Sequence, residues 1–321
     1  MKALITGGAG FIGSHLAEKL IQSGHAVTVI DDLSTGSIGN IDIIADSSRF
    51  NFVHDSVRNA KTMELLVEQC DVVFHLAAAV GVQLIVDKPV HTIETNIHGT
   101  EVALETANRF HKKILITSSS EVYGKSESVP FHEDDDSILG STMLARWSYA
   151  CSKAIDEFLA FAYHDQYSLP VIVTRLFNTV GPRQTGQYGM VIPRFVTRAL
   201  TNEPILIHGT GKQQRCFAYV EDIVDALIAL MECPGASGRV YNIGSTEEIS
   251  IEALADKIIE MTGSKSQKKY ISYKQAYGKA FDDMMRRLPS IERIGQTIGY
   301  EPKTSLEKTL RFIIDDIKSK L

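Results

Sequence analysis

The strongest indication of the fold is a glycine-rich stretch close to the N-terminus, Ile5-Thr6-Gly7-Gly8-Ala9-Gly10-Phe11-Ile12-Gly13. The apolar run Ala3-Leu4-Ile5 leads into the glycines, and residues 11–20 after them have the spacing of a helix. A strand, a glycine turn and a helix N-terminus in this order present unpaired N–H groups and the positive end of the helix dipole to an anion. Gly7, Gly10 and Gly13 allow a tight turn, the approach of a pyrophosphate and close packing of the helix on the strand. A tight turn without a ligand would use the same glycines.

A second apolar run with an acidic end favours a dinucleotide site. Val27-Thr28-Val29-Ile30 is followed by Asp31 and Asp32, about 20 residues after the glycines, where a carboxylate can hold a ribose diol. The two carboxylates would repel a 2′-phosphate, which predicts NAD rather than NADP. Asp55 and Ser56 after the third strand could contact the adenine or could equally cap the next helix. The predicted cofactor-binding residues are Gly7, Gly10, Phe11, Ile12, Gly13, Asp31, Asp32, Ser34, Gly36, Asp55, Ser56, Leu76, Ala77, Ala78, Tyr149 and Lys153.

The first half of the chain alternates β-rich runs with helical segments, which predicts an α/β fold with a doubly wound parallel (Rossmann) sheet. We expect a NAD-binding domain over residues 1–177. A smaller C-terminal α/β lobe for the substrate follows over residues 178–321, with some segments crossing back to the first domain. The predicted strands are 2–6, 26–31, 51–54, 72–75, 113–117 and 170–175, and the predicted helices are 13–24, 57–69, 90–110, 149–166, 191–201, 249–262 and 305–318.

Composition and charge are those of an ordinary globular protein. The 321 residues are 44% apolar and 22% charged, with a net charge of −6. An acidic balance gives no support for binding to nucleic acid or to an anionic membrane. No apolar run approaches the ~20 residues that span a bilayer, and there is no signal-peptide pattern. The four cysteines have no paired spacing, so neither a metal site nor a disulfide framework is predicted, and we expect a cytoplasmic protein.

The residues that carry chemistry are a tyrosine and a lysine four positions apart. Tyr149 and Lys153 share one face of a predicted helix, and Ser119 ends the fifth strand at the edge where ligands of such sheets bind. A free tyrosine has a pKa of about 10. A neighbouring ammonium, together with the positive ring of an oxidised nicotinamide, should lower the pKa of Tyr149. The phenolate can then accept a hydroxyl proton, although such a pair by itself also occurs on ordinary helix surfaces.

With these motifs in place, the chain resembles the extended short-chain dehydrogenase/reductases, in their nucleotide-sugar branch of epimerases, dehydratases and decarboxylases. The resemblance implies a bound NAD that oxidises C4 of a UDP-sugar and later returns the hydride. It also implies a homodimer formed through a four-helix bundle. The segments that carry the resemblance are 7–13, 75–78, 119–124, Tyr149 with Lys153, 177–183 and 211–215. The substrate contacts that it implies are Ser120, Asn178, Arg183, Arg215 and Arg287.

The branch depends on Ser119-Ser120-Glu121. A 4,6-dehydratase has an Asp where Ser120 stands, and 4-epimerases usually have a small residue in place of Glu121. The combination resembles UDP-glucuronate decarboxylases and implies catalytic roles for Ser119, Glu121, Tyr149, Lys153 and Arg215. Residues 184–190 instead resemble epimerases. The predicted function is therefore UDP-glucuronate decarboxylation to a UDP-pentose. The alternative is a 4-epimerase of a UDP-sugar or UDP-uronate; a 4,6-dehydratase or a non-catalytic NAD-sensing protein ranks behind these.

Overall fold

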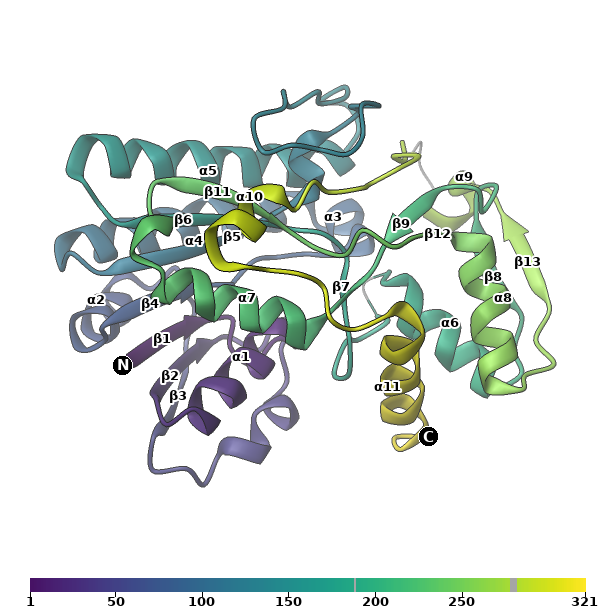
Figure 1. The fold of residues 1–321 in the computed structure, drawn as a ribbon, viewed down its shortest axis with the longest axis horizontal. Helices are drawn as coiled ribbons and strands as arrows, with labels where there is room; N and C mark the ends of the chain where they lie inside the picture. Colours follow the sequence, from purple (N-terminus) through teal and green to yellow (C-terminus); the bar gives the residue numbers. More distant parts are fainter. Residues whose placement is uncertain (188, 278–281) are drawn as a thin grey trace.

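The structure, a computed structural model, describes residues 1–187, 189–277 and 282–321. Within these residues the largest sheet has seven strands, all parallel, in the order β3-β2-β1-β4-β5-β6-β11 (Figure 1). Its strands are β1 (Lys2–Thr6), β2 (Ala26–Asp31), β3 (Phe50–His54), β4 (Val72–His75), β5 (Lys113–Ser119), β6 (Val171–Leu176) and β11 (Arg239–Ile243). The chain starts in the middle of the sheet and turns back at β4, so the sheet has the topological switch point at which nucleotides bind.

The register of the central strands brings their carboxyl ends to one edge. Thr6 at the end of β1 pairs with Ile30 of β2 and with His75 of β4. The strands are near-continuous apolar runs, as expected for a parallel sheet that is covered on both faces. The residues that follow β1, β2 and β4 therefore meet above the same edge.

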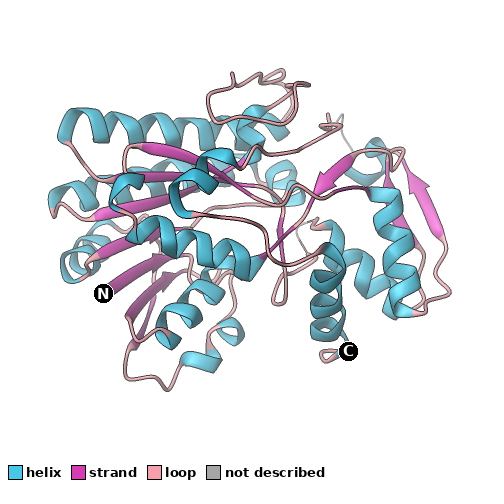
Figure 2. Ribbon diagram, in the orientation of Figure 1, coloured by secondary structure: helices cyan, strands magenta, loops and turns pink. Residues whose placement is uncertain are grey.

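Helices cover both faces of the sheet (Figures 1 and 2). Side chains of α1, α7 and α10 pack in one apolar core with the strands, and side chains of α2, α4 and α5 pack in a second core on the other face. The first group is α1 (Phe11–Gln22), α7 (Val220–Glu232) and α10 (Glu292–Ile298), and the second is α2 (Ala60–Gln69), α4 (Pro89–Arg109) and α5 (Arg146–Tyr167).

A third apolar core belongs to a smaller lobe beyond the carboxyl edge of the sheet, on the right in Figure 1. It is built from α6 (Val191–Leu200), α8 (Ile251–Thr262), α11 (Leu306–Lys318) and the parallel pair β8 (Ile205–His208) and β13 (Lys268–Ile271). The remaining strands are β7 (Thr179–Val180), β9 (Gln214–Cys216), β10 (Ala218–Tyr219) and β12 (Glu248–Ser250). The remaining helices are α3 (Val82–Asp87), α9 (Tyr273–Tyr277) and the short η1 (Ile38–Asn40), η2 (Asp42–Ile44), η3 (Ser120–Tyr123) and η4 (Pro234–Ala236).

The predicted fold class is confirmed. The six predicted strands of the first half are all present, with ends that differ by at most two residues. The sequence interpretation missed α7 and β11, both of which return from the second half of the chain to the large sheet; α10 was missed as well. Among the described residues no helix combines the length and the apolar character that a membrane crossing requires.

Candidate active site

A cavity of about 420 Å³ lies at the carboxyl ends of β1, β2 and β4, which is a usual size for a site that holds a cofactor. Thr117 near the end of β5 and Thr95 of α4 also reach it. Of the predicted cofactor-binding residues, those that line the cavity are Gly7, Gly10, Phe11, Ile12, Gly13, Asp31, Asp32, Ser34, Gly36, Leu76, Ala77 and Ala78. The sequence motifs therefore converge on one concave site.

The glycine turn fits a pyrophosphate. Gly7 has a φ of +71°, which favours glycine, and a Cβ on Gly13 would lie 2.7 Å from Gly8 Cα. Gly10 is the N-cap of α1, and no side chain of the described residues caps this helix end. The first N–H groups of α1 are thus available to an anion at the cavity wall.

The acidic end of β2 is fixed by the backbone around it. Asp31 is buried and accepts hydrogen bonds from Ala9 N at 3.0 Å and Leu33 N at 2.8 Å. Asp32 accepts one from Ser34 N at 3.0 Å. These bonds hold both carboxylates beside the cavity, in the place where the sequence predicts contact with a ribose.

Three predicted residues have partners other than the expected ligand. Asp55 accepts hydrogen bonds from Thr62 Oγ1 at 2.6 Å and Asn59 Nδ2 at 2.8 Å, and neither it nor Ser56 lines the cavity. The N-cap of α2 is Asn59, whose side chain accepts from Thr62 N, so Asp55 supports the start of this helix through Asn59 and Thr62 without capping it itself. Arg183, predicted to bind substrate, lines the cofactor cavity instead and pairs with Glu18 of α1.

Tyr149 and Lys153 lie one turn apart on α5, and Tyr149 contacts Ser119 at the end of β5. Tyr149 and Lys153 both point inward from α5, and both are buried. Ser119 hydrogen-bonds to Tyr149 and also accepts from the N–H of Glu121 at 3.2 Å. Within the described residues Tyr149 and Lys153 do not line the 420 Å³ cavity, so their predicted contact with the cofactor stays a prediction.

Asn96 ties the cavity to this tyrosine helix. Its side chain accepts from Ala79 N at 2.8 Å at the cavity wall and donates to Ser152 Oγ at 3.2 Å on α5. His75 nearby is a packed residue, as expected. It contacts Thr6 Oγ1 at 2.9 Å and Thr100 Oγ1 at 3.2 Å, and burial lowers its pKa to about 3, which keeps it neutral. His75 therefore brings no charge to the region between the cofactor cavity and α5.

The chain's own charged groups do not lower the pKa of Tyr149 as Lys153 was expected to do. Burial, together with the negative charge of Glu121, raises the pKa of Tyr149 instead of lowering it. The ammonium of Lys153 is paired with Asp156 at 2.7 Å, so the carboxylate offsets the effect of this positive charge on the Tyr149 phenol. The chain's own groups therefore favour a neutral phenol, and the phenolate that accepts a proton depends on the effect predicted for the positive nicotinamide ring.

Five buried charged side chains form an ionic cluster beside Tyr149. Glu121 pairs with Arg146 at 3.1 Å and Arg287 at 2.5 Å, and Asp283 pairs with Arg215 at 2.9 Å and Arg146 at 3.4 Å. Each of the five side chains is 5–15% exposed. Counted over these five side chains alone, three guanidinium groups face two carboxylates, an excess of one positive charge. This arrangement can attract an anionic group, and a planar carboxylate matches the guanidinium fork.

The sequence interpretation assigned roles to Glu121, Arg215 and Arg287 but none to Arg146 or Asp283. Arg146 precedes Tyr149 by three positions on α5, so its place on the same helix face was a readable signal. Asp283 had no local signal, since it reaches the site from a loop near the C-terminus.

Other predicted substrate contacts lie in structural roles. Asn178 donates to Cys216 O at 2.9 Å, which holds β9 in place, and Ser120 is buried within η3. Arg286, the neighbour of Arg287 and not itself a predicted contact, is exposed and pairs with Glu248 at 2.6 Å on the surface. Tyr188, within the epimerase-like segment 184–190, lies outside the described residues.

The cluster should make the protein's stability depend on acid. Although burial opposes it, the neighbouring arginines lower the pKa of both Glu121 and Asp283. A lowered folded-state pKa contributes stability above the ordinary carboxyl pKa of about 4, and this contribution is lost as the pH falls through the lower folded value. We expect urea unfolding midpoints to hold at pH 5 and fall below about pH 4. In Arg287→Met the pKa of Glu121 loses one of the charges that lower it, so the loss of stability between pH 5 and acid should be smaller than in the wild type. An unchanged profile would contradict the electrostatic role of the cluster.

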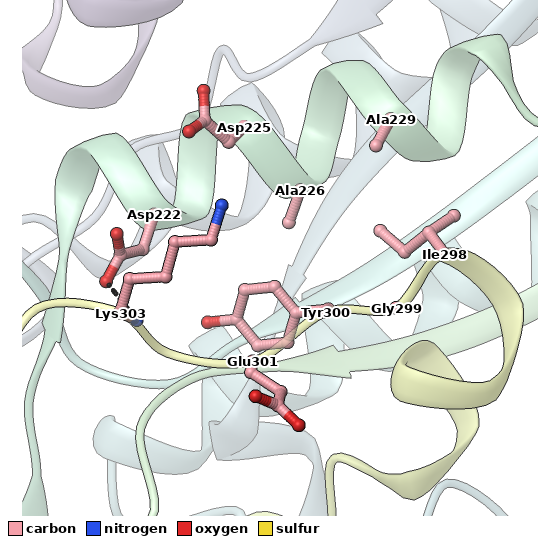
Figure 3. Close-up of a pocket in the computed structure, with 9 residues that line it drawn as sticks. All are labelled: Asp222, Asp225, Ala226, Ala229, Ile298, Gly299, Tyr300, Glu301 and Lys303. Carbon is pink, nitrogen blue, oxygen red and sulfur yellow. Dashed lines mark hydrogen bonds between the residues drawn. The ribbon is translucent and has the colours of Figure 1, made fainter.

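A second, smaller cavity lies between α7 and residues 298–303 (Figure 3). At this cavity Asp222 accepts hydrogen bonds from the backbone N–H groups of Lys303 and Thr304 at 3.0 and 2.9 Å. Tyr300, which points across the gap in Figure 3, donates to Gly244 O at 3.1 Å. The predicted site residues do not reach it, and these bonds fasten the C-terminal segment to the sheet domain.

Comparisons with known proteins agree with this geometry. Residues 4–313 match the family model described as GDP-mannose 4,6 dehydratase. The chain is 42% identical to the UDP-N-acetyl-alpha-D-glucosaminuronate decarboxylase of Bacillus cytotoxicus, over 97% of this chain and 95% of that protein. It is 35% identical to UDP-glucuronic acid decarboxylase 3 of Arabidopsis thaliana, over 100% of this chain and 90% of that protein. The crystal structure of UDP-glucuronic acid 4-epimerase from Bacillus cereus, in complex with UDP-glucuronic acid and NAD, superposes with a TM-score of 0.91 at 30% identity and covers 100% of both chains.

Proposed function

This chain belongs to the GDP-mannose 4,6-dehydratase family, in the nucleotide-sugar branch of the extended short-chain dehydrogenase/reductases, and we propose that it is an NAD-dependent UDP-hexuronate decarboxylase. In this proposal the 420 Å³ cavity holds NAD, with Gly7, Gly10 and Gly13 at the pyrophosphate and Asp31 at a ribose. Residues 1–177 form the cofactor domain, and residues 178–321, apart from the segments that return to the sheet, bind the nucleotide sugar.

The observation that carries the proposal is the unbalanced positive charge next to Tyr149. Arg146, Arg215 and Arg287 outnumber Glu121 and Asp283 by one charge in a buried site. The carboxylate of a uronic acid would bring the sum to zero, whereas a neutral hexose would leave a buried charge unpaired, which is costly. The site therefore favours a hexuronate over a neutral sugar.

The chain's own groups can carry the proton and charge movements of a decarboxylation. When bound, NAD would accept a hydride from C4 of the sugar and give it back to C4 after CO₂ has left, so the reaction has no net change of redox state. Tyr149 takes the proton of the C4 hydroxyl, with Ser119 as hydrogen-bond partner and Lys153 one turn away. Loss of CO₂ from the resulting β-keto acid places negative charge on the C4 oxygen, where Tyr149 and Ser119 stabilise it. Arg215 holds the carboxylate, and Glu121 organises the proton that returns to C5.

One incubation tests the proposal. Purified protein is given UDP-glucuronate and, separately, UDP-N-acetylglucosaminuronate, and released CO₂ and the NMR spectrum of the sugar product are recorded. We expect CO₂ together with a UDP-pentose or its 2-acetamido analogue. The acetamido substrate is included because the relative with 42% identity is named for it, whereas the relatives at 35% are named for UDP-glucuronate. Release of no CO₂ from either substrate would contradict the decarboxylase.

The second candidate is a UDP-uronate 4-epimerase, which the similarity to the Bacillus cereus epimerase favours. The cationic cluster would also bind the substrate of such an epimerase, because a UDP-uronate carries the same carboxylate. The same incubation separates the two, since an epimerase gives a product of unchanged mass with inverted C4.

The proposal includes a homodimer formed by α4 and α5 of two copies. Large apolar side chains on these helices are exposed: Val90 is 66% exposed and Phe158 74%. Together with Ile93 and Ile155 they give α4 and α5 an apolar outer face that a second copy would cover. The solution mass of the protein measures this, and a cytoplasmic location stays a prediction from the sequence.

A further inference from the structure

The tyrosine helix carries a buried acidic side chain to which the proposed reaction gives no task. Asp156 lies three residues after Lys153 on α5, and its Oδ2 is 2.7 Å from Lys153 Nζ. The two side chains are 1% and 2% exposed. Lys153 and Asp156 thus form an ion pair sealed from solvent, one helical turn beyond Tyr149.

This pair is poorly explained by fold stability. A buried ion pair roughly balances its desolvation cost, and apolar residues in its place are often as stable or more so. The second oxygen, Asp156 Oδ1, is buried without a hydrogen-bond partner among the described residues, which adds to the cost. A carboxylate held at such a cost beside two candidate catalytic groups points to a role in the site.

Among the described residues around Lys153, Asp156 is the acidic group that contacts its ammonium. His75 on β4 is neutral. Burial raises the pKa of the Asp156 carboxyl, and the hydrogen bond from the hydroxyl of Thr100 on α4 acts in the opposite direction with a smaller effect. Glu157, next on α5, is bound to Arg175 at 2.7 Å. Tyr149 also interacts with Ser119, Glu121 and Arg287, which the proposed function assigns to the substrate site.

We propose that Asp156 is a positioning residue for the tyrosine–lysine pair: its carboxylate fixes the Lys153 ammonium on α5 and limits how much positive charge reaches the Tyr149 hydroxyl. The inference rests on the proposed function in taking Tyr149 as the group that accepts the proton. Its consequence is that the working pH range of the enzyme depends on a residue that touches neither substrate nor cofactor.

The test of this role is the pH dependence of kcat in Asp156→Asn. Removal of the negative charge leaves the Lys153 charge unbalanced, which favours the phenolate of Tyr149. The acidic limb of the pH profile should therefore move to lower pH by about half a unit or more. Asp165→Asn is the matched control, since it removes the same charge from an exposed position on the same helix and should leave the limb in place. A limb that stays at its wild-type pH in Asp156→Asn, or moves to higher pH, overturns the proposal.

A thermal measurement tests the pairing without turnover. The melting temperatures of Lys153→Met, Asp156→Asn and the double variant, all loaded with NAD, form a double-mutant cycle. We expect each single change to lower the melting temperature and the double variant to lose clearly less than the sum of the two shifts. Additive shifts would overturn the pairing. Because this cycle needs no substrate, it tests the pairing of Lys153 with Asp156 even if Tyr149→Phe retains turnover and the proposed function fails.

Discussion

Tyr149→Phe is expected to lower kcat by about 10³-fold while the protein keeps its bound NAD. The change removes one hydroxyl, the group that accepts the C4 proton and later faces the charge on the C4 oxygen. The ring stays in its buried place on α5, so the walls of the cofactor cavity are unaffected. Turnover of the UDP-hexuronate is measured by CO₂ release, and retained NAD by the absorbance of the cofactor after denaturation.

Tyr163→Phe provides the matched comparison. Tyr163 lies on the same helix and packs against Tyr167 with ring centroids 5.5 Å apart, outside the site described above. Its substitution should change kcat by less than about twofold. If Tyr149→Phe kept a tenth of the wild-type turnover, another group would have to move the proton.

The half of the fold that could be predicted from sequence is the half in which local signals agree. The glycine turn after β1 and the acidic end of β2 fix two adjacent strands, and each later strand of the first half is a short apolar run separated by a helix of ordinary length. Because the connections are right-handed crossovers, the order of these strands follows with few alternatives.

The return of the chain to the sheet could not be predicted in the same way. β11 pairs with β6 in parallel, with Val240 opposite Val173, after more than 60 residues that belong partly to the smaller lobe. A strand that short carries no mark of the sheet it joins. α7 is apolar over much of its surface because it lies against the sheet. The sequence around it has no regular pattern, so the sequence interpretation missed this helix, which completes the cofactor domain.

In the site, spacing predicted positions but not charge balance. Tyr149 and Lys153 lie on one helix face as their spacing requires, yet the pKa of Tyr149 is raised because burial and Glu121 outweigh the lysine, which Asp156 holds. The ionic cluster is assembled from η3, α5, β9 and a loop near the C-terminus, and only the folded chain brings those segments together. For Arg183, the position in the motif predicted a substrate contact, whereas in the structure its guanidinium pairs with Glu18.

Glu157→Gln is expected to lower the free energy of unfolding by about 3–5 kcal/mol. Glu157 of α5 binds Arg175 of β6 through contacts at 2.7 and 3.0 Å and also accepts from Ser118 at the end of β5. Both charged side chains are at most 10% exposed. Glutamine cannot neutralise the guanidinium, so a buried charge would be left without its partner, and α5 would lose its anchor to the strands beneath Ser119. Urea unfolding of the NAD-loaded protein measures the loss.

Two comparisons separate the buried charge from a general sensitivity to substitution. Glu307→Gln breaks an exposed pair with Arg311 at 2.8 Å on α11 and should cost less than about 0.5 kcal/mol. The double variant Glu157→Met with Arg175→Met removes both buried charges, so it should recover much of the stability that Glu157→Gln loses. If the double variant were as unstable as the sum of its parts, shape and hydrogen bonding rather than the unpaired arginine would account for the loss, and the anchoring of α5 would have to be assigned to packing.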